Sequence, residues 1–142
     1  MNIEFKKLNI PKENEKYLQA QYHSTFMIDN VEITVPDEIY QFEKIDTTLL
    51  IVVDFFSDIK DINVLNLNRN IWCYNEKGEK EWEIMDMFES EEMKNKDTVK
   101  YRVEPYTGIW KEEEKIKVST FGGFTGVLDI KTGKVSNWSW SR

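Results

Sequence analysis

The sequence predicts an all-β protein: an antiparallel, hairpin-rich sandwich or open barrel of about eight or nine strands, with one short helix. Three observations support this fold class. Apolar and polar residues alternate with a period of two, most clearly in Val31–Val35. Turn-forming residues separate the alternating segments at short intervals. The segment Leu49–Phe56 is apolar except at Asp54, which is typical of a central strand covered on both faces.

Length and composition indicate one folded domain, residues 1–142, because a single domain commonly has about 100–200 residues. Hydrophobic residues make up 40% of the chain and charged residues 32%, as in folded, soluble proteins. No apolar segment near the start resembles a signal peptide, and the longest apolar run, Leu49–Val53, is far below the ~20 residues of a membrane span. We therefore expect a cytoplasmic protein.

The first predicted hairpin has Asp29-Asn30 as its two-residue turn, between residues 24–28 and Val31–Val35. Pro36-Asp37 ends the second strand because proline cannot donate to a strand ladder. Ile39–Ile45 is the next strand candidate, and the central apolar strand follows it.

The clearest hairpin joins Ile71–Tyr74 to Lys80–Ile84 through the turn Asn75–Gly78. Trp72 lies on the first of these strands and Trp82 on the second. We expect an aromatic pair across the strands, which contributes roughly 0.2–1 kcal/mol to such a hairpin.

Met85–Lys96 is the one helix candidate, because Phe88 and Met93 can face inward while the glutamates between them face outward. A helix this short needs tertiary support. Thr98–Val103 and Ile116–Phe121 are further strand candidates.

A last hairpin joins Val127–Ile130 to Val135–Trp140 through Lys131–Lys134. In this hairpin and in the earlier one, a turn containing glycine is followed by a tryptophan, Trp138 or Trp82. This pattern resembles a blade of the tryptophan-containing quinoprotein propellers, so a partial propeller-like sheet repeat is the alternative architecture. Propellers have about four to eight blades, and at ~40–45 residues a blade the chain has room for about three.

The charge is strongly asymmetric. The whole chain carries a net charge of -7, and residues 76–93 alone hold eight acidic and two basic residues. Such a chain is repelled by phosphates, so we expect no direct binding to nucleic acid and no binding to a membrane. A run of charges is most often a solvated face, but it can also serve as a docking site for a basic partner.

No motif in the chain indicates catalysis or metal binding. His23 is the only histidine, which excludes zinc motifs built on two histidines. Cys73 is the only cysteine and lies among strand aromatics, where a cysteine is usually a small hydrophobe. The glycine-rich segment Gly122–Gly126 lacks the lysine and the helix of a phosphate-binding loop and is predicted to be a strand-end loop. We therefore expect a protein that is not an enzyme and has no cofactor, no catalytic residues and no metal site.

The size, the acidity and the hairpin-rich segments Asn70–Tyr74 and Tyr106–Trp110 resemble the immunity proteins of bacterial polymorphic and contact-dependent toxin systems. Within that group, the chain is similar to the family paired with the wall-associated-protein (Wap) toxins of bacilli. The resemblance implies a tight complex with the C-terminal domain of a cognate toxin, often a basic nuclease.

In such a complex, carboxylates would mimic a phosphate backbone and speed association, while aromatic side chains would anchor the partner. The candidate partner-binding residues are Glu79, Glu81, Trp82, Glu83, Asp86, Glu89, Glu91, Glu92 and Trp110.

Two alternative functions stay open. The five tryptophans can stack on sugar rings, as in a small-ligand, carbohydrate-type binding β domain, although alternating aromatics in a small β domain more often form its core. The chain can also be a subunit of a larger β assembly.

Overall fold

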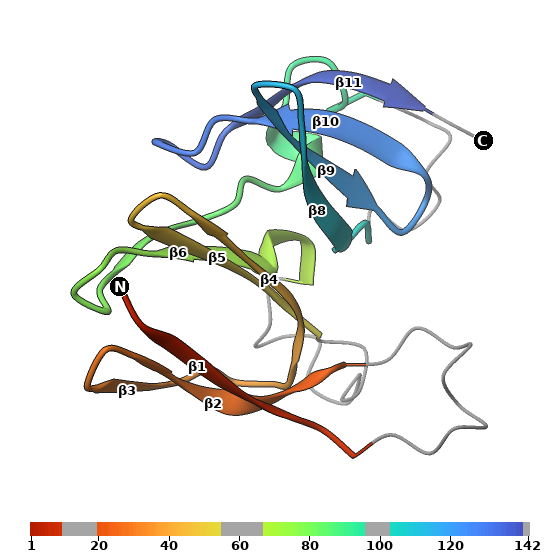
Figure 1. Ribbon diagram of the computed structural model, residues 1–142. Coiled ribbons are helices and arrows are strands. Elements are labelled where there is room, and N and C mark those ends of the chain that lie inside the picture. Colours follow the sequence, from red (N-terminus) through yellow and green to blue (C-terminus); the bar gives the residue numbers. More distant parts are fainter. Residues whose placement is uncertain (10–19, 55–66, 96–102, 141–142) are drawn as a thin grey trace.

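The computed structural model describes residues 1–9, 20–54, 67–95 and 103–140 (Figure 1). The fold is all-β, as predicted, and consists of two antiparallel sheets that do not close into a barrel. The described residues form eleven strands, more than the eight or nine predicted.

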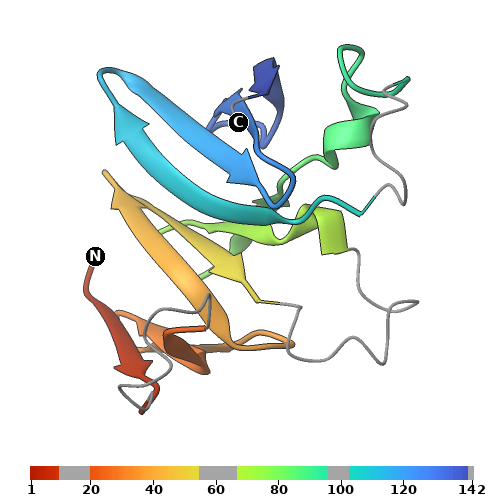
Figure 2. The same cartoon turned by 90° about the vertical axis from the view of Figure 1, so that its right-hand side faces the viewer.

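The larger sheet has seven strands in the order β1-β2-β4-β5-β6-β7, and β3 pairs with β2 off this path. Its strands are β1 (Ile3–Lys7), β2 (Tyr22–Ile28), β3 (Val31–Thr34), β4 (Ile39–Ile45), β5 (Thr48–Val53), β6 (Ile71–Tyr74) and β7 (Lys80–Glu83). The smaller sheet is a meander in the order β11-β10-β9-β8. Its strands are β8 (Tyr106–Glu112), β9 (Lys115–Thr120), β10 (Phe124–Leu128) and β11 (Val135–Trp140). Figures 1 and 2 both show the smaller sheet on one side of β4–β6 and β1–β3 on the other.

Strand β5 lies at the centre of the protein and is buried on both faces. Leu49, Ile51 and Val53 belong to a core enclosed by the larger sheet. Leu50 and Val52 belong to a second core, between the two sheets. None of these five side chains is more than 1% exposed. The prediction of a central strand is therefore confirmed through Val53, and its residues 55–56 lie outside the described ranges.

The predicted hairpins are confirmed, with connections at residues 29–30, 75–79 and 129–134, so the strand predicted to end at Ile130 ends at Leu128. Left-handed backbone supports these turns: φ is 52° at Asp29, 80° at Gly78 and 78° at Gly133. Aspartate and glycine adopt this conformation more readily than most residues, which is why the turns could be predicted locally.

Strand β1 was not predicted, and β8 was indicated only as the hairpin-rich segment Tyr106–Trp110, without strand bounds. β1 has only two apolar residues, Ile3 and Phe5, to mark its alternation. In β8 the alternation is broken, because a bulge at Thr107 shifts the register against β9 and Gly108 has no side chain to mark a face.

The helix predicted over Met85–Lys96 is wrong. The described part of this segment contains a 3-10 turn, η4 (Met87–Glu89), and a hydrogen-bonded turn over residues 91–95, but no α-helix. A capping box begins the turn at Asp86, but Ser90 has extended backbone and ends it after one turn. Met87, Phe88 and Met93 are nevertheless buried, against Phe124 of β10. The predicted strand at 98–103 falls mostly outside the described ranges.

The expected aromatic pair across the β6–β7 hairpin does not form, and Tyr74 lies opposite Lys80. The register places Cys73 opposite Trp82 and Glu83 opposite Trp72. Since side chains alternate along a strand, the two indoles lie on opposite faces of the sheet, and each packs against a different core.

Two side-chain amides join the larger sheet to the edge of β8. The Asn70 amide nitrogen donates to the carbonyl oxygens of Val53 (3.0 Å) and Tyr106 (2.8 Å), and its oxygen accepts the Tyr106 N–H at 2.8 Å. Gln41 on β4 donates to the Ile109 carbonyl oxygen at 2.7 Å and accepts the Ile109 N–H at 3.3 Å. Each amide thus forms with one β8 residue the pair of hydrogen bonds that a neighbouring antiparallel strand would form.

We predict that Asn70→Ala lowers the free energy of unfolding by about 2–4 kcal/mol, because three buried backbone groups lose their partner. Urea unfolding followed by tryptophan fluorescence measures this loss. The control is Ser136→Ala, at an exposed position of β11, which should change the free energy of unfolding by less than about 0.5 kcal/mol. A loss below 1 kcal/mol for Asn70→Ala would contradict the role of this amide.

A second variant, Asn70→Asp, tests the two donated hydrogen bonds. A carboxylate at this position would face two carbonyl oxygens, so the folded state would favour the protonated form and raise the pKa of the new carboxyl. The variant's stability deficit relative to the parent should therefore be large at pH 7 and should shrink as the pH falls towards 4. A pH-independent deficit would count against this arrangement.

Candidate functional site

The β6–β7 hairpin carries three of the predicted acidic residues near one another. Asn75 in its turn donates to the carboxylates of Glu79 (3.3 Å) and Glu81 (2.7 Å). Glu83 pairs with Lys80 at 2.6 Å, and both of these side chains are more than a third exposed. Because these contacts lie in water, they restrain the carboxylates only weakly and leave them accessible.

The acidic residues near η4 have mainly structural contacts. Asp86 accepts the Phe88 N–H at 3.0 Å and Glu89 accepts the Asp86 N–H at 3.2 Å, which completes the capping box. Glu89 also forms an ion pair with Arg69. Glu91 differs, because its side chain is 86% exposed and forms an ion pair with Lys94 at 2.7 Å on the surface.

Glu92 binds the outer edge of the smaller sheet. Its two carboxylate oxygens accept the backbone N–H groups of Asn137 and Trp138 on β11, each at 3.0 Å. Asn137 has a left-handed backbone, with φ 54°. Because an edge strand presents N–H groups that lack a neighbouring strand, the carboxylate takes the place of that neighbour.

The two predicted aromatic anchors are half-buried. The Trp82 indole N–H donates to the Ile130 carbonyl oxygen at 2.9 Å. Its ring lies against Gly133, where an added Cβ would come within 2.6 Å of it. Trp110 lies on β8, and its indole N–H donates to the Glu112 carboxylate at 3.2 Å. Trp82 thus joins the two sheets, and Trp110 comes from a different sheet than the acidic hairpin.

The most exposed large aromatics of the described chain are two residues that are not among the predicted partner-binding residues. Phe121 is 63% exposed and Trp140 is 60% exposed. The Trp140 indole N–H donates to the Gly122 carbonyl oxygen at 3.2 Å, which places it beside the β9–β10 turn that carries Phe121. Gly122 and Gly123 lie in this turn, which confirms that part of the predicted strand-end loop, but Phe124–Gly126 belong to β10, so the prediction is wrong for them.

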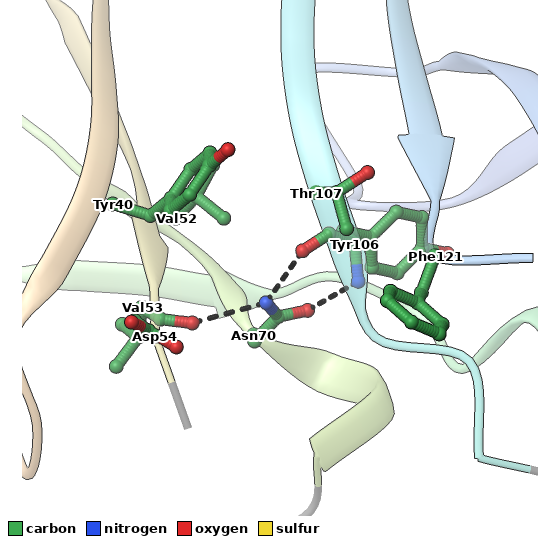
Figure 3. Close-up of a pocket in the computed structure, with 8 residues that line it drawn as sticks. All are labelled: Tyr40, Val52, Val53, Asp54, Asn70, Tyr106, Thr107 and Phe121. Atoms are coloured by element: carbon green, nitrogen blue, oxygen red, sulfur yellow. Dashed lines mark hydrogen bonds between the residues drawn. The ribbon is translucent and has the colours of Figure 1, made fainter. Parts of the chain in front are cut away.

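A pocket of about 250 Å³ lies where the two sheets meet, and we call it the seam pocket. Figure 3 shows Tyr40 and Val52 of the larger sheet on one side, Thr107 and Phe121 of the smaller sheet on the other, and Asn70 between them. The full lining is Tyr40, Val52, Val53, Asp54, Asn70, Tyr106, Thr107 and Phe121. These residues come from five separate parts of the chain, so no local pattern could have revealed the pocket.

The polar groups of the seam pocket are largely used by the fold. The Asn70 amide makes its three hydrogen bonds there, and the Tyr106 hydroxyl donates to the Met85 carbonyl oxygen at 2.7 Å. Burial, and next the negative charge of Asp54, raise the pKa of the Tyr40 hydroxyl. Tyr40 is therefore a neutral phenol at pH 7 and can donate a hydrogen bond.

The Phe121 turn is fixed to the start of β8. The Phe121 N–H donates to the Pro105 carbonyl oxygen at 3.0 Å. The buried Glu104 carboxylate accepts the Gly122 N–H at 2.8 Å. It lies so close that a Cβ on Gly122 would come within 2.4 Å of a carboxylate oxygen. A larger residue at position 122 would therefore require the Glu104 carboxylate to move away from this turn.

Cys73 is buried in the core between the sheets, which agrees with its interpretation as a small hydrophobe. Burial, with a smaller effect of the Glu81 charge, raises the pKa of its thiol to about 12. The thiol therefore stays protonated at neutral pH and is a poor nucleophile. Within the described ranges, no group of three or more His, Cys, Asp or Glu side chains could hold a metal ion.

Fold and site together define a two-sheet β protein with an acidic edge hairpin and an apolar pocket between its sheets. Residues 18–140 match the family described as a domain of unknown function (DUF7957), and the chain belongs to this family. Neither the curated proteins nor the solved structures include a match to the chain. No helix in the described parts is long and apolar enough to cross a membrane.

The neighbouring residues Glu91 and Glu92 allow a matched comparison of a carboxylate in an exposed ion pair with one that binds the backbone of β11. We predict that Glu92→Ala lowers the free energy of unfolding by about 1 kcal/mol, because two edge N–H groups lose a charged acceptor. Glu91→Ala should change it by less than about 0.5 kcal/mol, since its ion pair is exposed. Urea unfolding of both variants measures the difference, and equal losses would refute the role of Glu92.

Proposed function

We propose that the protein is a non-enzymatic immunity protein, which binds and neutralises the C-terminal domain of a cognate toxin in the bacterial cytoplasm. The toxin domain is a basic protein, and a nuclease fits best. The supporting observation is the β6–β7 hairpin at the edge of the larger sheet, where Glu76, Glu79 and Glu81 are all exposed.

Electrostatics favour this hairpin as the first point of contact. The chain carries a net charge of -7, and eight of its 26 acidic residues lie in residues 76–93. Charges interact over about 10 Å at 0.1 M ionic strength, so neighbouring carboxylates on one hairpin act together on an approaching cation. A nuclease must present positive charge to its substrate, and such a surface attracts this hairpin in the same way.

Charge complementarity mainly sets the association rate, so the complex also needs apolar contacts. Trp82 and Trp110 retain partly exposed rings, although their indole N–H groups are engaged within the protein. On this proposal they contact the partner through their ring faces. Structural contacts hold Asp86, Glu89 and Glu92, so these contribute charge rather than adaptable hydrogen bonds.

Affinity capture tests the proposal. The tagged protein is immobilised, exposed to a lysate of the source cell and eluted with a salt gradient, and the bound proteins are identified by mass spectrometry. We expect one basic partner with a nuclease-like C-terminal domain, which loses its activity when mixed with this protein. Capture of nothing, or only of further copies of the chain, would contradict the proposal.

A second prediction concerns the rate at which the partner associates with the exposed carboxylates of residues 76–93. The triple variant Glu79→Gln, Glu81→Gln and Glu91→Gln should bind the captured partner about tenfold more slowly at low salt, with a weaker salt dependence. The matched control removes three exposed charges elsewhere on the larger sheet, through Glu4→Gln, Glu32→Gln and Asp46→Asn. Stopped-flow association rates compare the two, and equal slowing would show that net charge, not this surface, steers the partner.

A further inference from the structure

We propose that the seam pocket binds a small aromatic molecule, one ring system in size and without negative charge. This site is separate from the acidic hairpin, and the inference does not depend on the proposed immunity function. It depends on the walls, the size, the polar groups and the charge of the pocket.

Aromatic and branched aliphatic side chains form the walls. Tyr40 and Val52 line one side, and Tyr106 and Phe121 line the other (Figure 3). Tyr106 is only 1% exposed, so Tyr40 and Phe121 are the aromatic residues with surface left for a ligand. Two such residues around one space favour a flat ring, since aromatic rings attract one another in stacked and edge-on arrangements. The volume of about 250 Å³ is below the ~300–1,000 Å³ of pockets for drug-sized ligands, so the size selects a single ring.

The polar groups disfavour a sugar. The Asn70 amide and the Tyr106 hydroxyl already have partners within the protein, at 2.7–3.0 Å. A ligand with many hydroxyl groups would lose its hydrogen bonds to water there and regain few. The Thr107 hydroxyl already shares a hydrogen bond with the Ser119 hydroxyl at 3.4 Å, so the Tyr40 hydroxyl is the main polar group offered to a ligand, which suits a ring with a single polar substituent.

The charge at the pocket disfavours anions. The carboxylate of Asp54 lines the pocket, and its negative charge acts on the Tyr40 phenol across the pocket wall. The same field opposes a second negative charge inside the pocket and tolerates a neutral or cationic ligand.

The exposed wall of the pocket is held in place before any ligand binds. Phe121 is 63% exposed, yet its turn is fixed by the hydrogen bonds to Pro105 and Glu104. A bound ring would cover this side chain, and removing apolar surface from water is favourable. Because the turn is already ordered, little conformational entropy is lost on binding.

Three probes of similar shape and different charge test the proposal: 2-phenylethanol (neutral), 2-phenylethylamine (cationic) and 3-phenylpropanoate (anionic). Each is titrated into the full chain, with binding followed by NMR chemical shifts. We expect Kd values of about 1 mM for the neutral and cationic probes, as befits ligands of about nine non-hydrogen atoms, and at least tenfold weaker binding of the anion. Glucose is titrated in the same way. The proposal would be overturned if neither the neutral nor the cationic probe bound saturably, if the anion bound with equal affinity, or if glucose alone bound.

Two variants locate the binding site. Phe121→Ala should weaken binding at least fivefold, and Thr107→Trp should abolish it by filling the pocket. Val31→Ala is the matched control, because it also truncates an exposed apolar side chain but lies on β3, outside the pocket lining. Since Phe121 is exposed, its variant is expected to fold even if Thr107→Trp does not. Unchanged affinity in Phe121→Ala would place the probes elsewhere and refute the assignment.

Discussion

The side-chain amide of Asn70 is the interaction on which the arrangement of the two sheets depends. It bonds to Val53 of β5 and to both backbone groups of Tyr106 on β8, all inside the protein. Without this amide, the packing of the sheets would leave those groups buried and unpaired, at a cost comparable to a large part of a domain's net stability. The amide therefore allows the core between the sheets to close, and it also forms part of the seam pocket.

Side chains also form hydrogen bonds with backbone groups at other strand edges. Gln41 forms two hydrogen bonds with Ile109 on β8, and Glu92 accepts two N–H groups on β11, so side chains stand in for neighbouring strands on both outer edges of the smaller sheet. This arrangement protects the edges from pairing with other chains. It also divides the acidic segment into carboxylates that hold the fold, such as Glu92, and carboxylates that remain at the surface, such as Glu81 and Glu91.

The two candidate sites differ in the physics that they offer a ligand. The acidic hairpin acts through charge over a distance of several ångströms and suits a large, basic partner. The seam pocket acts through contact and shape and suits one apolar ring. Asn70 takes part in both the seam pocket and the packing of the two sheets. The acidic hairpin contains β7, one edge strand of the larger sheet, and β1 is the other edge. Each site can therefore be altered at exposed residues while the other is left intact.

The sequence by itself determined the all-β class, the doubly buried strand β5 and the hairpin turns, because alternation and left-handed turn residues such as Gly133 are local properties. It misjudged the segment predicted as a helix, where a helical spacing of apolar residues and a capping box give one 3-10 turn and a further hydrogen-bonded turn over 91–95 but no α-helix in the described part. Only the tertiary structure decided which side chains cover the sheet edges and which line the pocket. Asn70 lies 36 residues from Tyr106, and Gln41 lies 68 residues from Ile109. No periodicity connects positions so far apart, since their contact arises only when the two sheets pack together.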